Sequence, residues 1–432
     1  MPSFGGLNVL VDGLYRFEAQ GSGISTYART LGDGLAAIGC SVNWLSGAAV
    51  GRGKADALYD EVALADRMPQ LSGLRRRTQT LRRMGEGLAS AHVTARRLAP
   101  RGAALSNQAS SHGNNVFLAP DLFVKAHYRH MLLRQFTEIR AAGKVDVLHL
   151  TAPLPVRMAG VKMVTTIHDL VPIRLPWTTP DNKSEFIDRV RTAAKLSDLI
   201  ITVSEASKRD IVDILDVDPD RIAVTWQPSD LAPLNDRERE SIPRVLSRFG
   251  LAPQQYALFV GAIEPKKNLR RLIEAFLETD SDMPLVIVGR KAWMWEDEIG
   301  FIDTLGQAAR SRLRLVGYAE RDDLRRLYAG AQMFLFPSLY EGFGLPPLEA
   351  MNAGCPVLVS DRGSLPEVCG GGALYADATN RDDIRMKIER MMGDEELRAN
   401  LAIAGRKRAQ AFSVNAYVAA LTSAYARLQA SS

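Results

Sequence analysis

Residues 334–360 have the sequence FLFPSLYEGFGLPPLEAMNAGCPVLVS, which alternates apolar runs with breaks rich in glycine and proline. The first apolar run predicts a β-strand that ends at Pro337. Because proline fits the first turn of a helix, a helix is expected to start at Pro346 or Pro347. Gly354 suits the position just beyond that helix, and the apolar run after it predicts a second strand. This order of strand, loop, helix and strand is typical of a parallel α/β sheet.

Two acidic residues lie on either side of the expected helix start. Glu341 falls in the loop, beside Gly342 and Gly344, and Glu349 falls in the first turns of the helix. Ligands bind at the carboxyl ends of the strands in open α/β sheets, so both carboxylates are placed to point into one crevice. Taken singly, Glu349 would merely complement the helix dipole, worth about 0.3–1 kcal/mol, and Glu341 would be an exposed loop acid. Their combination with a glycine-rich loop favours a ligand site.

The same alternation of short apolar runs and helical stretches extends through most of the chain and predicts two α/β domains. A polar stretch near residue 235, rich in proline and charged residues, is the expected linker. We therefore expect an N-terminal domain over 1–235, a C-terminal domain over 236–412, and a helix over 413–432 that packs back on the first domain. The expected strands are Asn8–Val11, Val42–Leu45, Val145–Leu150, Lys162–Ile167, Leu199–Val203, Ile222–Thr225, Ala257–Val260, Leu285–Val288, Leu313–Val316, Met333–Phe336 and Val357–Val359.

Residues 51–135 interrupt this alternation, because they contain no convincing strand, and we interpret them as an insertion. Leu74, Leu81, Met84 and Leu88 fall on one face of a helix, with arginines beside and opposite them. The basic residues of this region are Arg75, Arg76, Arg77, Arg82, Arg83, Arg96, Arg97 and Arg101. A helix carrying Arg75–Arg83 suits an anionic lipid or phosphate surface, and it suits a solvated helix packed on its own domain at least as well.

Composition places the chain among ordinary soluble globular proteins. Apolar residues make up 46% and charged residues 24%, and the formal net charge is +5. No apolar run reaches the roughly 18–20 residues that span a bilayer, and residues 1–6 lack the pattern of a secretory signal. The cysteines are few and scattered, as in reduced cytosolic proteins, so we expect a cytoplasmic location. The sequence contains no pattern typical of nucleic-acid binding and no cluster with metal-ligand spacing.

Three further segments carry candidate binding residues. Lys267 lies near the start of a helix, an unfavourable end for a positive charge, so a role in binding is favoured over a solvated cation. His168 and Asp169 follow a buried strand, where polar side chains are costly unless they serve a site, although an isolated histidine is by default a core residue. Gly21 and Gly23 precede a helix and fit either a phosphate loop or a simple turn.

Two other patterns favour structural roles. The sequence Ser364-Leu-Pro-Glu367 fits a capping box, in which Glu367 serves the start of its own helix. The acidic run 216–220 contains Pro219 and precedes an expected strand, so it predicts a turn and not a metal-binding D-x-D sequence.

The stretch 334–360 resembles the E-x7-E motif of retaining GT-B glycosyltransferases of family 4, with Glu341 and Glu349 at the two acidic positions. The resemblance implies an α/β GT-B fold, in which two Rossmann-like doubly wound domains face a central cleft. It also implies that Glu349 hydrogen-bonds the donor ribose and that Glu341 contacts hydroxyls of the transferred sugar. The residues of the loop and helix start that the resemblance places at the donor are Gly342, Phe343, Gly344 and Leu345.

Residues 260–276, with the sequence VGAIEPKKNLRRLIEAF, resemble the phosphate-binding segment of the same family. Lys267 takes the place of the lysine that neutralises the donor diphosphate. Many relatives carry an arginine after the strand glycine, where this chain has Ala262, so Lys266 or Arg290 is expected to supply the second cation. The Glu-Pro-Lys-Lys-Asn sequence resembles one subgroup that contains many mannosyl- and other hexosyltransferases.

The resemblance extends to the N-terminal half. Gly21 and Gly23 are similar to the glycine loop that closes over the donor phosphate, and His168 takes the place of a histidine near the sugar 6-hydroxyl or the acceptor. Tyr318, which follows an expected strand, is placed near the donor base. The resemblance therefore implies Glu341, His168 and Lys267 as the catalytic residues.

The implied reaction moves a hexosyl unit, with retained configuration, from a nucleotide-diphosphate sugar to a hydroxyl of a saccharide or lipid-linked acceptor. No cofactor and no metal are expected, and GDP-mannose is the first expected donor. The expected setting is polysaccharide or glycolipid assembly, in the cytoplasm or at the cytoplasmic face of a membrane. A GT-B sugar-nucleotide epimerase, a glycogen- or sucrose-type synthase and a catalytically silent GT-B scaffold subunit are the alternatives.

Overall fold

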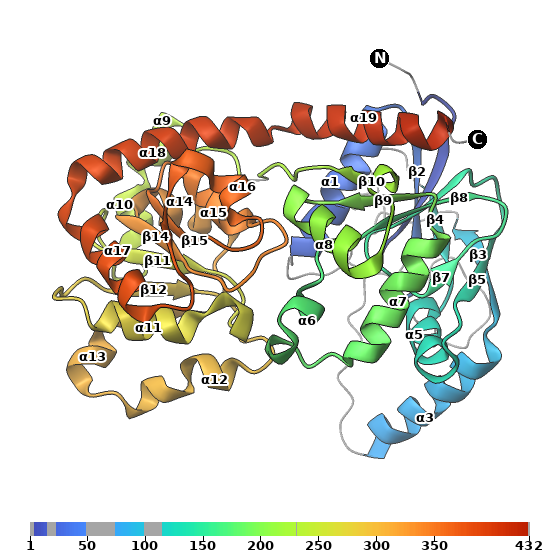
Figure 1. The fold of residues 1–432 in the computed structure, drawn as a ribbon, viewed down its shortest axis with the longest axis horizontal. Helices are drawn as coiled ribbons and strands as arrows, with labels where there is room; N and C mark the ends of the chain where they lie inside the picture. Colours follow the sequence, from blue (N-terminus) through green and yellow to red (C-terminus); the bar gives the residue numbers. More distant parts are fainter. Residues whose placement is uncertain (1–3, 15–22, 49–73, 99–114, 230, 431–432) are drawn as a thin grey trace.

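The computed structural model describes residues 4–14, 23–48, 74–98, 115–229 and 231–430. Two α/β bodies lie side by side, with the C-terminal body on the left and the N-terminal body on the right in Figure 1. The last two long helices, α18 (Glu395–Ala409) and α19 (Val414–Ala430), run along one edge of both bodies and link them. Within the described ranges, no helix combines the length and the apolar character needed to cross a bilayer.

The C-terminal body is built on a six-stranded sheet with the order β13-β12-β11-β14-β15-β16. Each neighbouring pair in it is parallel. Most of its residues are buried, which explains why these strands appear in the sequence as short continuous apolar runs. The strands are β11 (Ala257–Val260), β12 (Leu285–Val288), β13 (Leu313–Val316), β14 (Met333–Phe336), β15 (Val357–Ser360) and β16 (Ala373–Ala376). Five of these were expected, and β16 was not.

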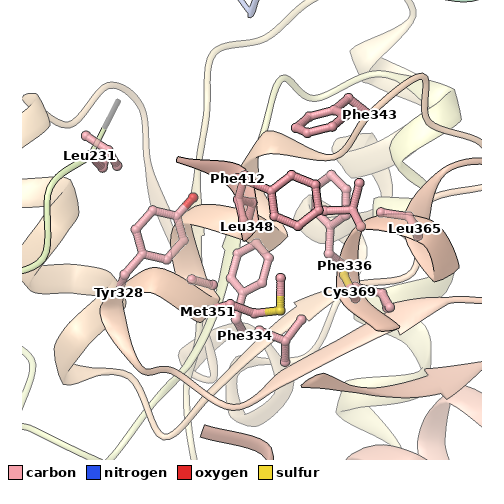
Figure 2. Packing of buried hydrophobic residues seen from close by; sticks show 14 of the residues in the cluster. Leu231, Tyr328, Phe334, Phe336, Phe343, Leu348, Met351, Leu365, Cys369 and Phe412 are labelled. Carbon is pink, nitrogen blue, oxygen red and sulfur yellow. The ribbon is translucent and has the colours of Figure 1, made fainter. Parts of the chain in front are cut away.

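Helices cover both faces of this sheet and enclose an aromatic core. Figure 2 shows Leu348 and Met351 of α15 packed against Phe334 and Phe336 of β14. The two phenylalanine rings stack with centroids 5.8 Å apart. The helices are α9 (Asp236–Glu240), α10 (Ile242–Ser247), α11 (Leu269–Leu277), α12 (Trp295–Ile299), α13 (Gln307–Ser311), α14 (Arg321–Gly330), α15 (Leu345–Ala353), α16 (Leu365–Cys369), α17 (Arg381–Gly393) and α18, with 3-10 turns η3 (Pro265–Lys267), η4 (Gly300–Thr304), η5 (Gly370–Gly372) and η6 (Gln410–Phe412).

The N-terminal body is built on a ten-stranded sheet with the order β10-β9-β8-β6-β1-β2-β4-β3-β5-β7. Among the described strands β3 and β4 pair antiparallel, and the other neighbours pair parallel. The strands are β1 (Asn8–Asp12), β2 (Ser41–Ser46), β3 (His92–Leu98), β4 (Val116–Leu118), β5 (Thr137–Ala141), β6 (Val147–Leu150), β7 (Val156–Arg157), β8 (Lys162–Thr166), β9 (Leu199–Thr202) and β10 (Ile222–Val224).

The expectation that residues 51–135 contain no strand is wrong, because β3 and β4 lie in this segment and extend the sheet. In β3 only Ala95 and Leu98 are buried, and Arg96 and Arg97 lie on this strand. Charged residues in a half-exposed strand hide its apolar alternation. Strand β4 is a run of three buried residues, too short to recognise by periodicity.

The expected basic helix is present as α3 (Leu74–Ala89), which packs against α5 (Leu122–Leu133). The Arg129 guanidinium on α5 donates from Nη1 to the carbonyl oxygen of Leu88 at 2.9 Å. The side chains of residues 74–81, including Arg75, Arg76 and Arg77, lie outside the described part of the chain. The other helices of this body are α1 (Gly23–Ala37), α6 (Val171–Arg174), α7 (Lys183–Leu196) and α8 (Glu205–Leu215), with 3-10 turns η1 (Pro176–Thr178) and η2 (Pro219–Arg221).

The C-terminal helix α19 packs back on the N-terminal body, as expected from its amphipathic pattern. Tyr417, Leu421 and Tyr425 of α19 are buried against α1. The contact is close at Gly34, because a Cβ at this position would lie 2.8 Å from the Cε1 atom of Tyr417. The Tyr425 hydroxyl also lies 2.8 Å from Nδ1 of the buried His149.

Filling the space at Gly34 should therefore weaken the packing of α19. Gly34→Leu is expected to lower the free energy of unfolding by about 1–3 kcal/mol, because overpacking forces the helices apart. Gly85→Leu on the exposed face of α3, where a Cβ meets nothing within 4 Å, is the matched control. The control should leave stability unchanged or raise it by about 0.5–1 kcal/mol, as glycine is unfavourable within helices. Urea unfolding measures both, and equal effects of the two variants would contradict the packing argument.

Candidate functional site

A buried ion pair joins the two segments that follow β11 and β14. The Lys267 ammonium lies 2.6 Å from Oε1 of Glu341, and both residues are buried. Nζ of Lys267 also lies 5.0 Å from the centre of the Phe336 ring, within the range of a cation–π contact. Two of the predicted site residues are thus brought together at the carboxyl end of the six-stranded sheet.

Asn268 holds these two segments together. It has a left-handed backbone, with φ of 59°, which asparagine tolerates better than most residues. Its side-chain amide donates to the carbonyl oxygens of Pro337 at 2.9 Å and Ala378 at 2.8 Å. The backbone N–H of Leu339 donates to the carbonyl oxygen of Lys266 at 2.8 Å. The positions of Lys267 and Glu341 are therefore fixed by the backbone around them.

Lys266 and Glu264 add a second pair of charges beside the first. The Lys266 ammonium lies 3.6 Å from Oε1 of Glu264. Burial disfavours the charged form of Lys266, but the carboxylates of Glu341, Asp169 and Glu264 outweigh it and raise the pKa of this ammonium. For Glu264 burial prevails and raises the pKa of the carboxyl group. Lys266 therefore keeps its positive charge beside the Lys267–Glu341 pair.

Glu341 is ionised despite its burial. Desolvation disfavours its carboxylate, but the ammonium groups of Lys267 and Lys266 hold its pKa below the usual range. The neighbouring backbone is fixed by Ser364, whose hydroxyl donates to the carbonyl oxygens of Glu341 at 3.0 Å and Phe343 at 2.6 Å. The Phe343 ring in turn packs edge-on against Phe412, with centroids 5.8 Å apart.

The loop that carries Glu341 meets the His168–Asp169 turn of the N-terminal body. A Cβ at Gly342 would lie 2.9 Å from the carbonyl oxygen of His168 and 2.9 Å from Cβ and Oδ2 of Asp169. A side chain at 342 would therefore collide with this turn. The two sequence motifs are in direct contact, at the place where the carboxyl ends of both sheets face each other.

His168 is held in one tautomer. Its Nε2 lies 2.8 Å from the carbonyl oxygen of Thr151, which can only accept, so Nε2 carries the proton. Burial lowers the pKa of the imidazole, although the hydrogen bond to Thr151 and the charge of Asp169 oppose the shift. The Tyr27 ring packs edge-on at 4.7 Å from the His168 ring. Neutral His168 thus keeps Nδ1 as a hydrogen-bond acceptor.

Asp12, at the end of β1, is a supporting residue that the sequence analysis missed. Its carboxylate accepts hydrogen bonds from the backbone N–H of Thr151 and from the Thr151 hydroxyl, the latter at 3.0 Å. Burial raises the pKa of Asp12 to about 6, although the bonds from Thr151 oppose the shift. Asp12 thereby fixes the residue whose carbonyl orients His168. A polar residue at the end of a buried apolar strand is the signal that could have found it.

Glu349 is held by a different element from Glu341. It lies on α15, partly buried, and accepts a hydrogen bond from the Tyr328 hydroxyl of α14 at 3.0 Å. Helix α15 starts after Gly344, a residue with φ of 105°, and its first turn receives no side-chain cap. Leu345 begins this helix. Tyr328 had no signal in the sequence, because it lies on another helix and its own surroundings are apolar.

The remaining predicted residues differ in how the structure places them. Arg290 follows β12 and is exposed, and Tyr318 follows β13 and is 65% exposed. Gly289, directly before Arg290, packs against the backbone that follows β11. A Cβ at this position would lie 1.8 Å from the carbonyl oxygen of Gly261, so only glycine fits there. Gly23 starts α1, whereas Gly21 lies outside the described residues.

The expected capping box at Ser364 and Glu367 does not form. Ser364 has a helical backbone, and its hydroxyl donates to the carbonyl oxygen of Glu341 in the preceding loop, so it does not cap α16. Glu367 instead accepts hydrogen bonds from the backbone N–H groups of Glu205 at 2.8 Å and Ala206 at 3.0 Å, and from Nε1 of Trp226 at 2.7 Å. Its carboxylate therefore caps α8 of the other body and not its own helix.

The Lys267–Glu341 pair predicts a pH-dependent loss of stability. Glu341, with its lowered pKa, contributes stability above its unfolded pKa of about 4.3 and loses it as pH falls through the folded value. Lys267→Met leaves a buried carboxylate without its nearest cation, so unfolding free energy at pH 7 should fall by about 3–5 kcal/mol. Without Lys267 the pKa of this carboxyl should rise, so protonation relieves the unpaired charge as the pH falls, and the loss should be smaller at about pH 4.5 than at pH 7.

Urea unfolding at the two pH values measures this difference. Arg385→Met, which removes the surface pair of Arg385 and Glu389 at 2.8 Å, is the control. It should cost less than about 1 kcal/mol. An equal loss at both pH values for Lys267→Met would show that Glu341 does not depend on Lys267 for its charge.

Comparison with known families matches both halves of the chain. The model described as "Glycosyl transferases group 1" matches residues 248–408, and the model described as "Glycosyltransferase Family 4" matches residues 78–232. The O-antigen chain mannosyltransferase B of Escherichia coli is 35% identical over 257 residues, which are 58% of this chain and 67% of that protein. The family-4 match includes part of the segment first interpreted as an insertion.

Solved structures share the fold over nearly the whole chain. The sucrose-phosphate synthase of Thermosynechococcus elongatus has a TM-score of 0.67 at 17% identity, covering 99% of this chain and all of that chain. Anabaena HepE, solved in complex with UDP and glucose, has a TM-score of 0.65 at 14% identity, covering 97% of this chain and 99% of that one. The chain therefore belongs to the group 1/family 4 glycosyltransferases and is a hexosyltransferase with the GT-B fold.

Proposed function

We propose that this enzyme transfers a mannosyl unit, with retained configuration, from GDP-mannose to a hydroxyl of a saccharide or lipid-linked acceptor. The observation that carries the proposal is the buried Lys267–Glu341 pair in contact with the His168–Asp169 turn. The similarity to an O-antigen mannosyltransferase supports mannose and a role in polysaccharide or glycolipid assembly.

The two lysines are suited to a diphosphate leaving group. Lys267 is buried in the site and Lys266 is half-buried, and the neighbouring carboxylates of Glu341, Asp169 and Glu264 keep the Lys266 ammonium charged. A donor diphosphate brings further negative charge, which these ammonium groups and the uncapped N-terminus of α15 are placed to stabilise. In the reaction this stabilisation grows as the bond between the sugar and the phosphate breaks.

Glu341 and His168 are assigned to the transferred sugar. A carboxylate accepts hydrogen bonds from vicinal hydroxyls, and the ionised carboxylate of Glu341 lies in the loop where the sugar is proposed to bind. Neutral His168 offers Nδ1 as an acceptor for a sugar or acceptor hydroxyl. No side chain is assigned as a covalent nucleophile, and we propose front-face attack assisted by the departing phosphate, with Lys266 or Arg290 as the second cation at the diphosphate and Tyr318 near the donor base.

The N-terminal body offers a surface for an anionic membrane. Leu88 of α3 is 47% exposed, and Met131, Leu132 and Leu133 at the end of α5 are 38–42% exposed. These four residues, here named the apolar ridge, lie on two helices that pack together at the outer end of the body (Figure 1). Arg134 is exposed directly after the ridge and adds positive charge, whereas the nearby Arg82 is paired with Glu86 at 2.8 Å. Apolar side chains flanked by cations are typical of surfaces that bind anionic lipid.

Nucleotide binding tests the donor site. Calorimetric titration of GDP, UDP, ADP and dTDP should show binding of GDP, weakened by about 1–3 kcal/mol in Glu349→Ala through loss of a charged hydrogen bond. Tyr328→Phe, which removes one hydrogen bond to Glu349 and keeps its carboxylate, should weaken binding less. Glu389→Ala on α17 is the control and should bind as the wild type does. If no nucleotide binds, or if Glu349→Ala binds normally, the assigned donor site is wrong and the scaffold alternative is favoured.

Liposome flotation tests the membrane surface. Replacing Met131, Leu132 and Leu133 with serine should reduce binding to vesicles rich in anionic lipid, because less apolar area is buried on the membrane. Replacing Arg75, Arg76 and Arg77 with serine should have a similar effect through charge. The control replaces Met386 and Ile403 with serine; these residues are 51% and 61% exposed on the C-terminal body, and their replacement should leave vesicle binding unchanged. Binding that is absent in the wild type, or unchanged in both test variants, would refute the membrane role.

A further inference from the structure

The loop that carries Glu341 is hydrogen-bonded on both sides to helix α8 of the N-terminal body. On one side, the Tyr340 hydroxyl donates to Oδ2 of Asp210 at 2.5 Å. On the other, the Gly342 carbonyl oxygen accepts from the Ser204 hydroxyl at 2.7 Å and the Ser207 hydroxyl at 3.2 Å. Each bond joins residues more than a hundred positions apart in the chain. The residue between them is therefore held by both bodies.

Asp210 is well placed to fix Tyr340, because its other oxygen is already occupied. The Arg174 guanidinium donates to Oδ1 of Asp210 from Nε at 2.9 Å and from Nη2 at 2.6 Å. Asp210 is 3% exposed, so its carboxylate cannot turn toward water. The two guanidinium contacts leave Oδ2 directed at the Tyr340 hydroxyl.

Helix α8 is itself fixed to the C-terminal body at its start. The Glu367 carboxylate accepts from the backbone N–H groups of Glu205 and Ala206, the first two residues of α8. Ser204, the N-cap residue, also accepts from the N–H of Ser207 at 3.0 Å. The helix therefore cannot shift along its axis without breaking contacts to Glu367 and to the Glu341 loop together.

The Glu341 carboxylate depends on this arrangement for its direction. Its ion pair with Lys267 lies wholly within the C-terminal body, whereas its backbone neighbours Tyr340 and Gly342 are bonded to α8. A rotation of the loop that loses the Tyr340 contact would move residue 341 relative to the His168–Asp169 turn, which touches Gly342. The two bodies must be docked on each other for the loop to keep its present shape.

We propose that Tyr340 is a positioning residue, which through its hydrogen bond to Asp210 aligns Glu341 with the transferred sugar when the two bodies dock. The proposal rests on the proposed function, because it takes Glu341 as the residue that contacts the sugar. Tyr340 acts through the backbone of the loop and not on the substrate. Loss of the Tyr340 hydroxyl should therefore lower kcat, whereas the contacts that Glu349 and the lysines are proposed to make with the nucleotide should stay in place.

Tyr340→Phe tests this role, since it removes the hydroxyl and keeps the ring. We expect kcat for sugar transfer to fall by about 10- to 100-fold, as small misalignments at a reacting centre commonly do. The Kd for GDP and the thermal midpoint should stay near those of the wild type. Tyr375→Phe is the matched control, because it removes a tyrosine hydrogen bond of 2.6 Å, to the carbonyl oxygen of Gly370, away from α8.

Asp210 variants separate positioning from general packing. Asp210→Asn can keep its amide oxygen on the Arg174 guanidinium and donate from its NH2 group to the Tyr340 oxygen, so it should retain more activity than Asp210→Ala. The double variant Tyr340→Phe with Asp210→Ala should lose no more activity than Asp210→Ala alone, because the Tyr340–Asp210 hydrogen bond is already lost in that single variant. Additive losses, or a Tyr340→Phe enzyme with kcat within twofold of the wild type, would overturn the proposal.

Hydrogen exchange gives a readout that does not require turnover. Backbone amides of residues 339–345 should exchange faster in Tyr340→Phe and Asp210→Ala than in the wild type and in Tyr375→Phe. If the wild type transfers no sugar and binds no nucleotide, the proposed function fails, whereas the exchange data still decide whether Tyr340 positions the loop. Unchanged exchange in residues 339–345 would overturn the positioning role by itself.

Discussion

The buried ion pair between Lys267 and Glu341 requires that the two segments carrying these residues stay close together. A charge removed from water is strongly destabilising unless an opposite charge and further hydrogen bonds satisfy it. The two partners belong to different crossover segments of the six-stranded sheet, so the segments after β11 and β14 must be held in register. The Asn268 amide and the Leu339 N–H supply that support from the backbone. The catalytic chemistry proposed for this site uses the same charges that the fold must already balance.

The strands of the C-terminal sheet could be predicted except for β16, whereas in the N-terminal sheet β1, β2, β6, β8, β9 and β10 could be predicted and β3, β4, β5 and β7 could not. Strands such as β11 and β12 lie inside a parallel sheet and are apolar on both faces, so a short hydrophobic run is sufficient to identify them. Strands β3, β5 and β7 lie at the far side of the ten-stranded sheet and carry polar and charged residues. Arg96 and Arg97 of β3 belong to a run of basic residues in which the sequence shows no strand, because a local pattern does not show which sheet edge a strand joins.

The site divides in the same way. Glu341, Lys267 and His168 lie in segments with local signals, such as glycine loops, a proline at a helix start and a polar residue after an apolar strand. Their supports come from elsewhere: Thr151 and Asp12 for His168, and Asp210 for the Glu341 loop. The misjudged capping box at Glu367 shows the limit clearly. The sequence spacing suits a cap at the start of α16, a helix of five residues. In the folded chain, however, Glu367 accepts hydrogen bonds from the first N–H groups of α8.

The last helix extends this dependence across the whole chain. Tyr425 of α19 lies 2.8 Å from His149, whose Nε2 lies 3.1 Å from the Thr166 hydroxyl, and Thr166 lies 2.7 Å from the Tyr27 hydroxyl. Burial lowers the pKa of His149 to about 3, so this network stays neutral at ordinary pH. Because Tyr27 packs on His168, the C-terminal helix supports a residue assigned to the sugar in the N-terminal body. Both bodies therefore complete each other's half of the site: α19 and Glu367 support the N-terminal half, and α8 supports the C-terminal half.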